Sequence, residues 1–555
     1  MSAAAKLNGT HKINAFLTNF VLISLGVVFF VLSHPNIFFK NGVSFLAWIM
    51  YVPVFLVIYR SKIHHCIFWG ALFGYFALTL FSYWVGSYHF FAGVVVGLIY
   101  LTYFAILFPF LKLAIILFPR FGYLAQLPLW VGFEYLRTLG FVGYAYGITG
   151  YTQWQHPVLI QIASIFGVWG VSALVIFPSI LLANFLWIRF WEGGKAPYAA
   201  KAASQRFSAT PAPAAIVWLC LLIAAIIYGN LSQLDYEEMP KARIALVQNN
   251  ADPWKDEKAD YRNNFLTLKR LSEEVLAQSP APELVVWSET AFVPMIYWNI
   301  HYRTDAEYYA QVKELIDFLK TKEMPFLIGN DDGRRVMNEF GYNQRIDYNA
   351  AILLNKGEIT DIYRKIHLVP FAEYFPYKKQ LPLIYNILEK TDTHFWEPGK
   401  TYTVFDNGSF KFSTPICFED TFGYLSREFV KNGAEIIVNI SNDSWSASLT
   451  AQMQHLSMAV FRSVENRRSM ARSTASGQTC GIDPNGKIVA ELAPFTAAAL
   501  TVELPVVKET TTFYTKHGDF LPVFSTAAAV LILLCGAIWH IIKYYAKSKK
   551  NSNSR

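Results

Sequence analysis

Eight long apolar runs constrain this chain more than any other feature of its sequence. Each has about the 20 residues that a helix needs to cross a hydrocarbon core. The runs cover residues 13–33, 42–59, 67–87, 90–118, 123–139, 158–188, 213–230 and 522–543. With 54% hydrophobic residues in the chain, this pattern predicts an α-helical membrane domain of about eight spans.

The runs divide the chain into four predicted parts. Residues 1–235 form an N-terminal membrane domain with seven transmembrane helices, 241–508 a separate domain, 520–545 a C-terminal transmembrane helix and 546–555 a basic tail. Within 241–508, strand-like apolar runs alternate with amphipathic helical patterns, which indicates a layered α/β fold. Residues 191–212 are predicted to form a flexible cytoplasmic loop.

Lysine and arginine residues gather on one side of the predicted membrane. With eight spans, one face carries Lys6, Lys12, Arg60, Lys62, Arg120, Arg189, Lys195, Lys201, Arg206, Lys543, Lys547, Lys549, Lys550 and Arg555. The short loops of the other face carry little beyond Lys40. By the positive-inside rule, both termini are cytoplasmic and 241–508 lies outside the cytoplasm, on the periplasmic side of a bacterial inner membrane. The net charge of +8 is then mostly a topology signal, and no basic face predicts a nucleic-acid partner.

The five cysteines point to neither a metal nor a disulfide framework. Cys66, Cys220 and Cys535 fall in or beside apolar runs, and no CxxC pair occurs. A bridge between Cys417 and Cys480 stays open.

Three segments in the polar domain place reactive side chains at or near strand ends. VVWSETA carries Glu289, YRKIHLVPFAEYFP carries Lys365 and Glu373, and TPICFED carries Cys417. A carboxylate can take a thiol proton, and an ammonium can stabilise the thiolate and then the oxyanion of a tetrahedral intermediate. The pattern indicates acyl transfer through a thioester, although a lone cysteine after an apolar strand is commonly a core residue.

In this order, the three segments resemble the nitrilase (carbon–nitrogen hydrolase) superfamily. NISNDSW (439–445) and QMQHLSMAVFRSVENRR (452–468) resemble the segments that come after the nucleophile in that superfamily. The resemblance implies an α-β-β-α sandwich. Apolar spans before and after such a domain also resemble the apolipoprotein N-acyltransferase family, and this similarity covers nearly the whole chain.

The resemblance implies a role for each matching residue. Cys417 is the expected nucleophile, Glu289 the general base and Lys365 the partner of the thiolate and oxyanion. Glu373 is the expected supporting carboxylate, and Glu419 is expected to position the nucleophile turn. Two departures stand out: Phe418 replaces the tyrosine that often follows the cysteine, and Ala475 lies where many relatives have asparagine nearby.

The implied reaction is the N-acylation of lipoproteins. A membrane phospholipid would give its acyl chain to the cysteine, and the thioester would acylate the α-amino group of an S-diacylglyceryl N-terminal cysteine. No metal or organic cofactor is implied, and the oligomeric state is not readable. Two alternatives are a membrane-tethered amidase that hydrolyses a small amide or nitrile, and a transporter or receptor with an inactive domain of this kind.

Three further residues are candidates for binding substrate. Glu134 and Arg137 lie one helical turn apart in the fifth apolar run, and charges inside a membrane are functional candidates. They either contact a phospholipid headgroup or form a structural ion pair. Trp254 is either a mobile aromatic residue near the pocket or a surface tryptophan.

Overall fold

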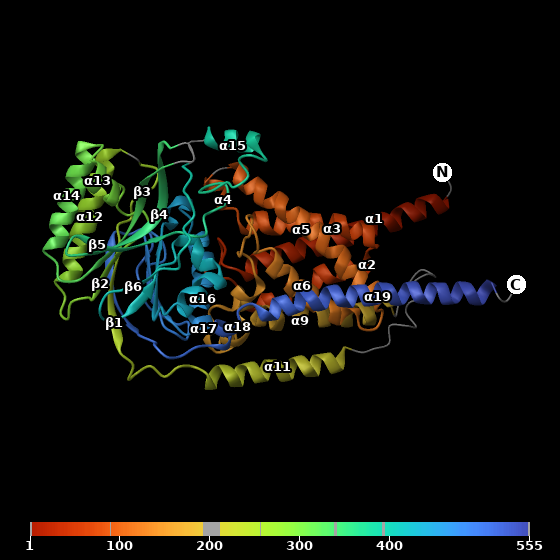
Figure 1. Ribbon diagram of the computed structural model, residues 1–555. Helices are drawn as coiled ribbons and strands as arrows, with labels where there is room; N and C mark the ends of the chain where they lie inside the picture. Colours follow the sequence, from red (N-terminus) through yellow and green to blue (C-terminus); the bar gives the residue numbers. More distant parts are fainter. Residues whose placement is uncertain are drawn as a thin grey trace. The chain divides into compact units, whose positions relative to one another are not determined.

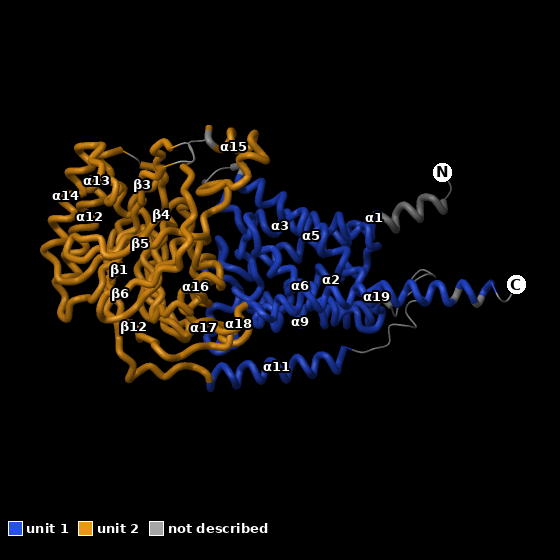
Figure 2. Tube along the Cα trace, in the orientation of Figure 1, with its two compact units in different colours: residues 1–162, 168–231, 519–555 blue, residues 163–167, 232–518 orange. Residues whose placement is uncertain are grey.

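The computed structural model describes residues 3–88, 90–192, 211–255, 257–337, 341–390 and 394–552, arranged as two compact units (Figure 2). One unit comprises residues 1–162, 168–231 and 519–555, and the other comprises 163–167 and 232–518. Most of the predicted loop 191–212, with Lys195, Lys201 and Arg206, lies outside the described residues.

The first unit consists of helices. In chain order they are α1 (Ala3–Ser33), η1 (Ser44–Trp48), α2 (Val52–Arg60), α3 (Ile63–Phe81), α4 (Val85–Tyr88), α5 (Phe90–Leu117), α6 (Gly122–Leu136), η2 (Thr149–Gln153), α7 (Pro157–Ile160), α9 (Val168–Leu186), η3 (Trp187–Glu192), α11 (Ala212–Leu231) and α19 (Phe520–Ser552). Among the described residues, six helices are long and apolar enough to cross a membrane: those at 13–33, 63–81, 92–117, 168–190, 212–231 and 520–546.

The predicted spans differ from the helices in three places. Segments 42–59 and 123–139 form shorter helices, so the count of eight is approximate. The run 158–188 is not one helix, because Gly167 has a φ of +64° and α9 begins only at Val168. In addition, α19 continues to Ser552, through most of the predicted tail.

Glycines allow two long helices of this unit to pack closely. A Cβ atom at Gly70 of α3 would lie 2.2 Å from the carbonyl oxygen of Phe104 in α5, and one at Gly74 would lie 2.3 Å from that of Tyr100. Small residues four apart are typical of helix pairs in membranes. Many apolar side chains of this unit are exposed, including Leu17, Ile216 and Leu531, which fits contact with lipid.

The second unit contains two six-stranded sheets with the same pattern of parallel and antiparallel strand pairs. The first has the order β12-β1-β2-β3-β4-β5 and the second the order β11-β10-β9-β8-β7-β6. In each sheet three neighbouring strands are parallel, β1 to β3 in the first and β7 to β9 in the second, and the outer strands are antiparallel. The strands are β1 (Lys241–Gln248), β2 (Leu284–Trp287), β3 (Phe326–Met337), β4 (Asn343–Asn355), β5 (Glu358–Arg364), β6 (Val404–Asp406), β7 (Lys411–Ser413), β8 (Ile436–Ser441), β9 (Ser469–Thr474), β10 (Cys480–Ile482), β11 (Ile488–Glu491) and β12 (Ala498–Pro505).

Helices cover both outer faces of the sheets, which confirms the predicted α-β-β-α sandwich (Figure 1). The first face carries α12 (Lys258–Leu276), α13 (Ile296–Tyr302) and α14 (Ala306–Lys320), and the second carries α16 (Gly423–Lys431) and α17 (Leu449–Asn466). The unit also contains α8 (Ala163–Phe166), α15 (Pro382–Glu389), η4 (Cys417–Thr421), η5 (Asp443–Ser446) and α18 (Phe513–His517). The apolar side chains between the sheets, such as Leu246, Val286, Phe412 and Val438, are fully buried.

Candidate active site

The candidate residues lie where strands of the sandwich end. Glu289 follows β2, Lys365 follows β5, and Cys417 comes one residue after Ile416, which bridges to Ile440 of β8. Parallel strands end at one edge of a sheet, and functional groups of layered α/β folds gather there. The packing of the two sheets thus brings side chains from three distant segments, two in the first sheet and one beside the second, to one place.

Lys365 is the centre of a buried cluster of charges. Its Nζ lies 3.2 Å from Oε1 of Glu289 and 2.8 Å from Oε1 of Glu373. Asn349 Nδ2 donates to the same Glu289 oxygen at 2.8 Å, and the Asn442 backbone N–H donates to Glu289 Oε2 at 2.9 Å. Lys365 is fully buried, so the two carboxylates hold its ammonium group in one position, and Asn349 and Asn442 fix the carboxylate of Glu289.

Electrostatics keep this ammonium charged and the thiol neutral. Burial alone would lower the pKa of Lys365, but the charges of Glu289 and Glu373 raise it well above its usual range. Burial and the charge of Glu289 raise the pKa of Cys417, whereas Lys365 opposes this shift. Cys417 therefore rests as a thiol beside a carboxylate, and its proton leaves only when a reaction requires the thiolate.

The backbone at Cys417 has the left-handed conformation, with a φ of +50°. A residue other than glycine rarely adopts this region, and such strain is typical of functional turns. The turn leads into η4 and leaves the side chain partly exposed. All five cysteines are free, so no Cys417–Cys480 bridge is present.

Glu419 fixes the nucleophile turn to the segment that carries Lys365. Its Oε1 accepts from the backbone N–H groups of Ile366 at 2.7 Å and His367 at 2.9 Å, and its Oε2 accepts from that of Ile416 at 2.8 Å. The hydroxyl of Tyr363 donates to the same carboxylate. Burial raises the pKa of Glu419 to about 7, although the amides of Ile416 and His367 favour the ionised form.

We expect Glu419→Ala to lower the free energy of unfolding by about 3 kcal/mol or more, because it leaves several buried donors without an acceptor. Glu419→Gln should cost about 1–3 kcal/mol, since its amide nitrogen would face one N–H donor. Thermal unfolding of the detergent-solubilised protein measures both, with exposed Glu509→Gln as the control. A Gln variant as stable as the wild type would contradict this account of the turn.

The two departures from the family pattern, Phe418 and Ala475, both lie at buried positions. The Phe418 ring is buried and packs edge-on against Phe422, with centroids 4.9 Å apart. Its surroundings also include His367, whose pKa is lowered to about 4 by burial and by the charge of Lys365. Ala475 is buried and connects strands through its backbone, which accepts from Asn250 N–H at 2.7 Å.

Trp254 is exposed and pairs with a second aromatic residue. Its ring meets that of Trp445 edge-on, with centroids 5.3 Å apart, and 61% of Trp254 is accessible. Trp445 belongs to η5. This short helix comes directly after Asn442, whose backbone N–H donates to Glu289. A substrate contact by Trp254 stays a prediction, and Trp445 joins it as a neighbour that the sequence did not single out.

Glu134 and Arg137 are buried within the helical unit and hold its own loop. Glu134 Oε1 accepts from the N–H and hydroxyl of Thr149 at 3.0 and 2.6 Å. Arg137 donates to the hydroxyl of Tyr100 and to the carbonyl oxygen of Tyr146. Each side chain thus binds groups of its own unit, and a contact of either with a lipid headgroup stays a prediction.

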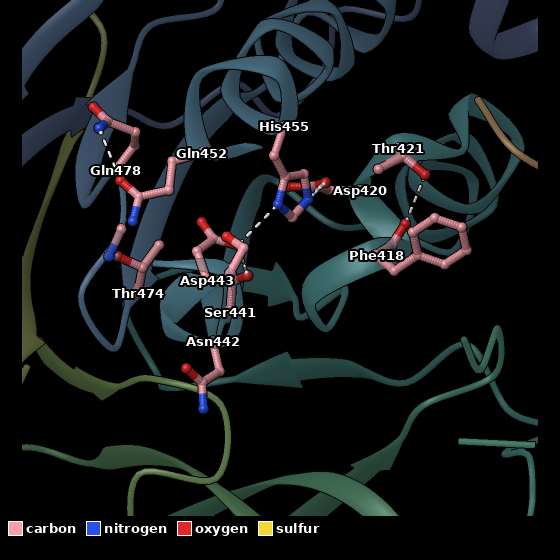
Figure 3. A network of polar contacts seen from close by, with 12 residues as sticks. Phe418, Asp420, Thr421, Ser441, Asn442, Asp443, Gln452, His455, Thr474 and Gln478 are labelled. Atoms are coloured by element: carbon pink, nitrogen blue, oxygen red, sulfur yellow. Dashed lines mark hydrogen bonds and ion pairs between the residues drawn. The ribbon is translucent and has the colours of Figure 1, made fainter. Parts of the chain in front are cut away.

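Sequence reasoning missed a polar network behind the nucleophile turn (Figure 3). Asp420, Asp443, His455 and Arg472 form it, and Ser441 lies beside it. Asn349, which holds both carboxylates beside Lys365, was missed as well. The segments TPICFED, NISNDSW and QMQHLSMAVFRSVENRR contain Asp420, Asp443 and His455, but spacing along the chain does not show that these residues meet, because each comes from a different strand, turn or helix.

Most of the chain matches known protein families. Residues 243–512 match the family model described as carbon-nitrogen hydrolase, and residues 25–181 match that of the apolipoprotein N-acyltransferase N-terminal domain. Among solved structures, Saccharomyces cerevisiae Nit3 of the nitrilase superfamily covers 52% of this chain and 94% of its own, with 20% identity and a TM-score of 0.35. The match to the family model identifies residues 243–512 as a carbon–nitrogen hydrolase domain.

The nearly full-length relatives define the family more narrowly. The chain is 44% identical over 540 residues to apolipoprotein N-acyltransferase 1 of Treponema denticola, which covers 94% of this chain and 97% of that protein. It is 42% identical to the protein of the same name from Treponema pallidum, over 95% of this chain and 97% of the relative. The chain belongs to the apolipoprotein N-acyltransferase family and is a membrane protein with an acyltransferase domain.

Proposed function

We propose that this protein transfers an acyl chain from a membrane phospholipid to the α-amino group of the S-diacylglyceryl N-terminal cysteine of lipoproteins. Similarity to N-acyltransferases over nearly the full length carries this proposal. The membrane helices also support it over a small-amide hydrolase, since two lipid-anchored substrates need an enzyme at the bilayer. The acyltransferase domain then lies on the periplasmic side of a bacterial inner membrane, with both termini in the cytoplasm.

The first half-reaction loads the cysteine. Glu289 takes the proton of the Cys417 thiol, and the thiolate attacks the ester carbonyl of the phospholipid. The ammonium of Lys365 stabilises the oxyanion, and the two neighbouring carboxylates supply the fixed position that this task requires. The ester C–O bond then breaks, Glu289 returns the proton to the leaving oxygen, and a lysophospholipid departs.

The second half-reaction transfers the acyl chain from Cys417 to the acceptor amine. The free amine of the diacylglyceryl cysteine attacks the thioester, Glu289 accepts a proton from the nitrogen, and the C–S bond breaks as the amide forms. The departing thiolate takes the proton back. The raised pKa of Cys417 suits this cycle, because the resting thiol must be restored after each transfer.

We expect the detergent-solubilised protein to form a hydroxylamine-sensitive acyl adduct when it is incubated with a phospholipid that carries a labelled chain. Intact-mass analysis detects the adduct, and addition of a diacylglyceryl-cysteine peptide should move the label to the peptide amine. A small amide serves as the comparison donor. A folded protein that hydrolyses the amide but takes no label from phospholipid would overturn the proposal in favour of the amidase.

A further inference from the structure

A buried charged network lies behind the nucleophile turn (Figure 3). The ring of His455, on α17, has Nε2 2.6 Å from Oδ1 of Asp420 and Nδ1 3.0 Å from Oδ1 of Asp443. Arg472, on β9, donates to Asp443 Oδ2 at 3.2 Å, and its Nε lies 3.5 Å from Asp420 Oδ2. Asp420 and Arg472 are fully buried, and the other two are at most 8% exposed. The carboxylates of Asp420 and Asp443 thus lie against the side chains of His455 and Arg472 in the protein interior, away from solvent.

Ser441 connects this network to the nucleophile. Its hydroxyl donates to Asp443 Oδ1 at 2.9 Å. Ile416 pairs with Ile440 in a parallel bridge, so Cys417 and Ser441 are the next residues of two adjacent segments, and Ser441 lowers the pKa of the Cys417 thiol against the effect of burial. A hydroxyl has one proton to donate. While that proton is on Asp443, Ser441 can only accept from the thiol. Once the thiolate forms, the sulfur becomes an acceptor, and the proton must turn from Asp443 to stabilise it.

We propose that His455 is a positioning residue for the nucleophile: with Arg472 it neutralises Asp443, which releases the Ser441 proton toward the sulfur when the thiolate forms. The acyl-transfer role of Cys417 underlies this inference, but its test measures the thiol itself. A failure here is therefore distinguishable from a failure of the proposed function.

The charge on His455 depends on the groups that face it. Burial alone would lower its pKa, but the Asp420 and Asp443 carboxylates raise it to about 9, against the opposing charge of Arg472. With one carboxylate 2.6 Å from Nε2 and another 3.0 Å from Nδ1, the ring carries a proton on both nitrogens at neutral pH. It loses one as the pH rises through 9, and Arg472 Nη2, which lies 2.8 Å from Nδ1, can then donate to that nitrogen. Without the imidazolium, Arg472 alone would face two carboxylates, and Asp443 would hold the Ser441 proton more tightly.

The test is the pH profile of iodoacetamide alkylation at Cys417 in the full-length, detergent-solubilised protein, read by peptide mass spectrometry. N-acetylcysteine added to every sample is the reference thiol, because Cys220 lies in the membrane-crossing helix α11. We expect His455→Gln to lower the Cys417 rate about tenfold at pH 8, a shift of about one pH unit. Asp443→Asn should have the opposite sign and raise the rate, because it removes a charge that opposes the thiolate.

Rate changes of opposite sign in His455→Gln and Asp443→Asn distinguish a positioning role from a purely structural one, since structural damage would change the alkylation rate of both variants in the same direction. Ser441→Ala removes one oxygen atom and gives a second test if His455→Gln does not fold: it should lower the Cys417 rate severalfold. In the Ser441→Ala background, His455→Gln should lower the Cys417 alkylation rate by a smaller factor than it does in the wild type. An unchanged His455→Gln profile in a folded protein, equal signs for the two charge variants, or an unchanged Ser441→Ala rate would each overturn the proposal.

Discussion

Cys417→Ala is expected to abolish acyl transfer, with a rate at least about four orders of magnitude below that of the wild type. The loss is large because no other group in the site can form the thioester: Lys365 is held as a cation by two carboxylates, and Glu289 is bound by Lys365, Asn349 and Asn442. The measurement is the rate at which a diacylglyceryl-cysteine peptide is N-acylated, together with the mass of the acyl-enzyme.

Two control variants locate the effect at this sulfur. Cys220→Ala removes an exposed thiol and should leave both the adduct and the transfer rate unchanged. Cys417→Ser keeps the shape of the side chain, but its hydroxyl gives up a proton far less readily than a thiol, so transfer should remain severely reduced. An acyl adduct that survives in Cys417→Ala would place the nucleophile elsewhere.

The sequence predicts the parts of this protein that depend on local patterns. The alternation of apolar strands and amphipathic helices in 241–508 predicted a layered α/β fold, and the resemblance to the nitrilase superfamily implied the sandwich. The strands around 284–287 and 436–441 occur where the pattern indicated. Glu289, Lys365 and Cys417 became candidates because each lies beside an apolar strand in a segment that resembles that superfamily. Apolar length likewise predicted most of the helices at 13–33, 90–118 and 213–230.

The remaining features depend on contacts between distant segments or on single backbone angles. The break before Val168 comes from one positive φ at Gly167, which an apolar run does not reveal. Glu419 looks like a surface acid beside the cysteine, yet it is fully buried and accepts from Tyr363, 56 residues earlier in the chain. His455 lies in an ordinary amphipathic helix pattern, and only the folded strands bring Asp420 and Asp443 to its ring.

Lys365→Met is expected to lower the transfer rate by about three orders of magnitude and to change how stability depends on pH. The rate falls because the oxyanion loses its cation. Methionine fills a similar volume, so the main structural cost is electrostatic. Glu289 and Glu373, which now both contact the ammonium and both lie within reach of Asn349 Nδ2, would become two buried like charges.

The sign of the pH effect is set by proton binding. Two close carboxylates without a cation have raised pKa values in the folded state, so the folded variant binds more protons than the unfolded chain. Its stability relative to the wild type should therefore be lowest at pH 8 and recover as the pH falls toward 5.5, which thermal unfolding across this range measures. The double variant Lys365→Met/Glu373→Gln separates the two effects, because it removes the repulsion between the carboxylates but does not restore the cation. Stability at pH 8 should therefore recover, while transfer stays lost. Recovery of transfer in the double variant would show that Lys365 serves only to neutralise the carboxylates.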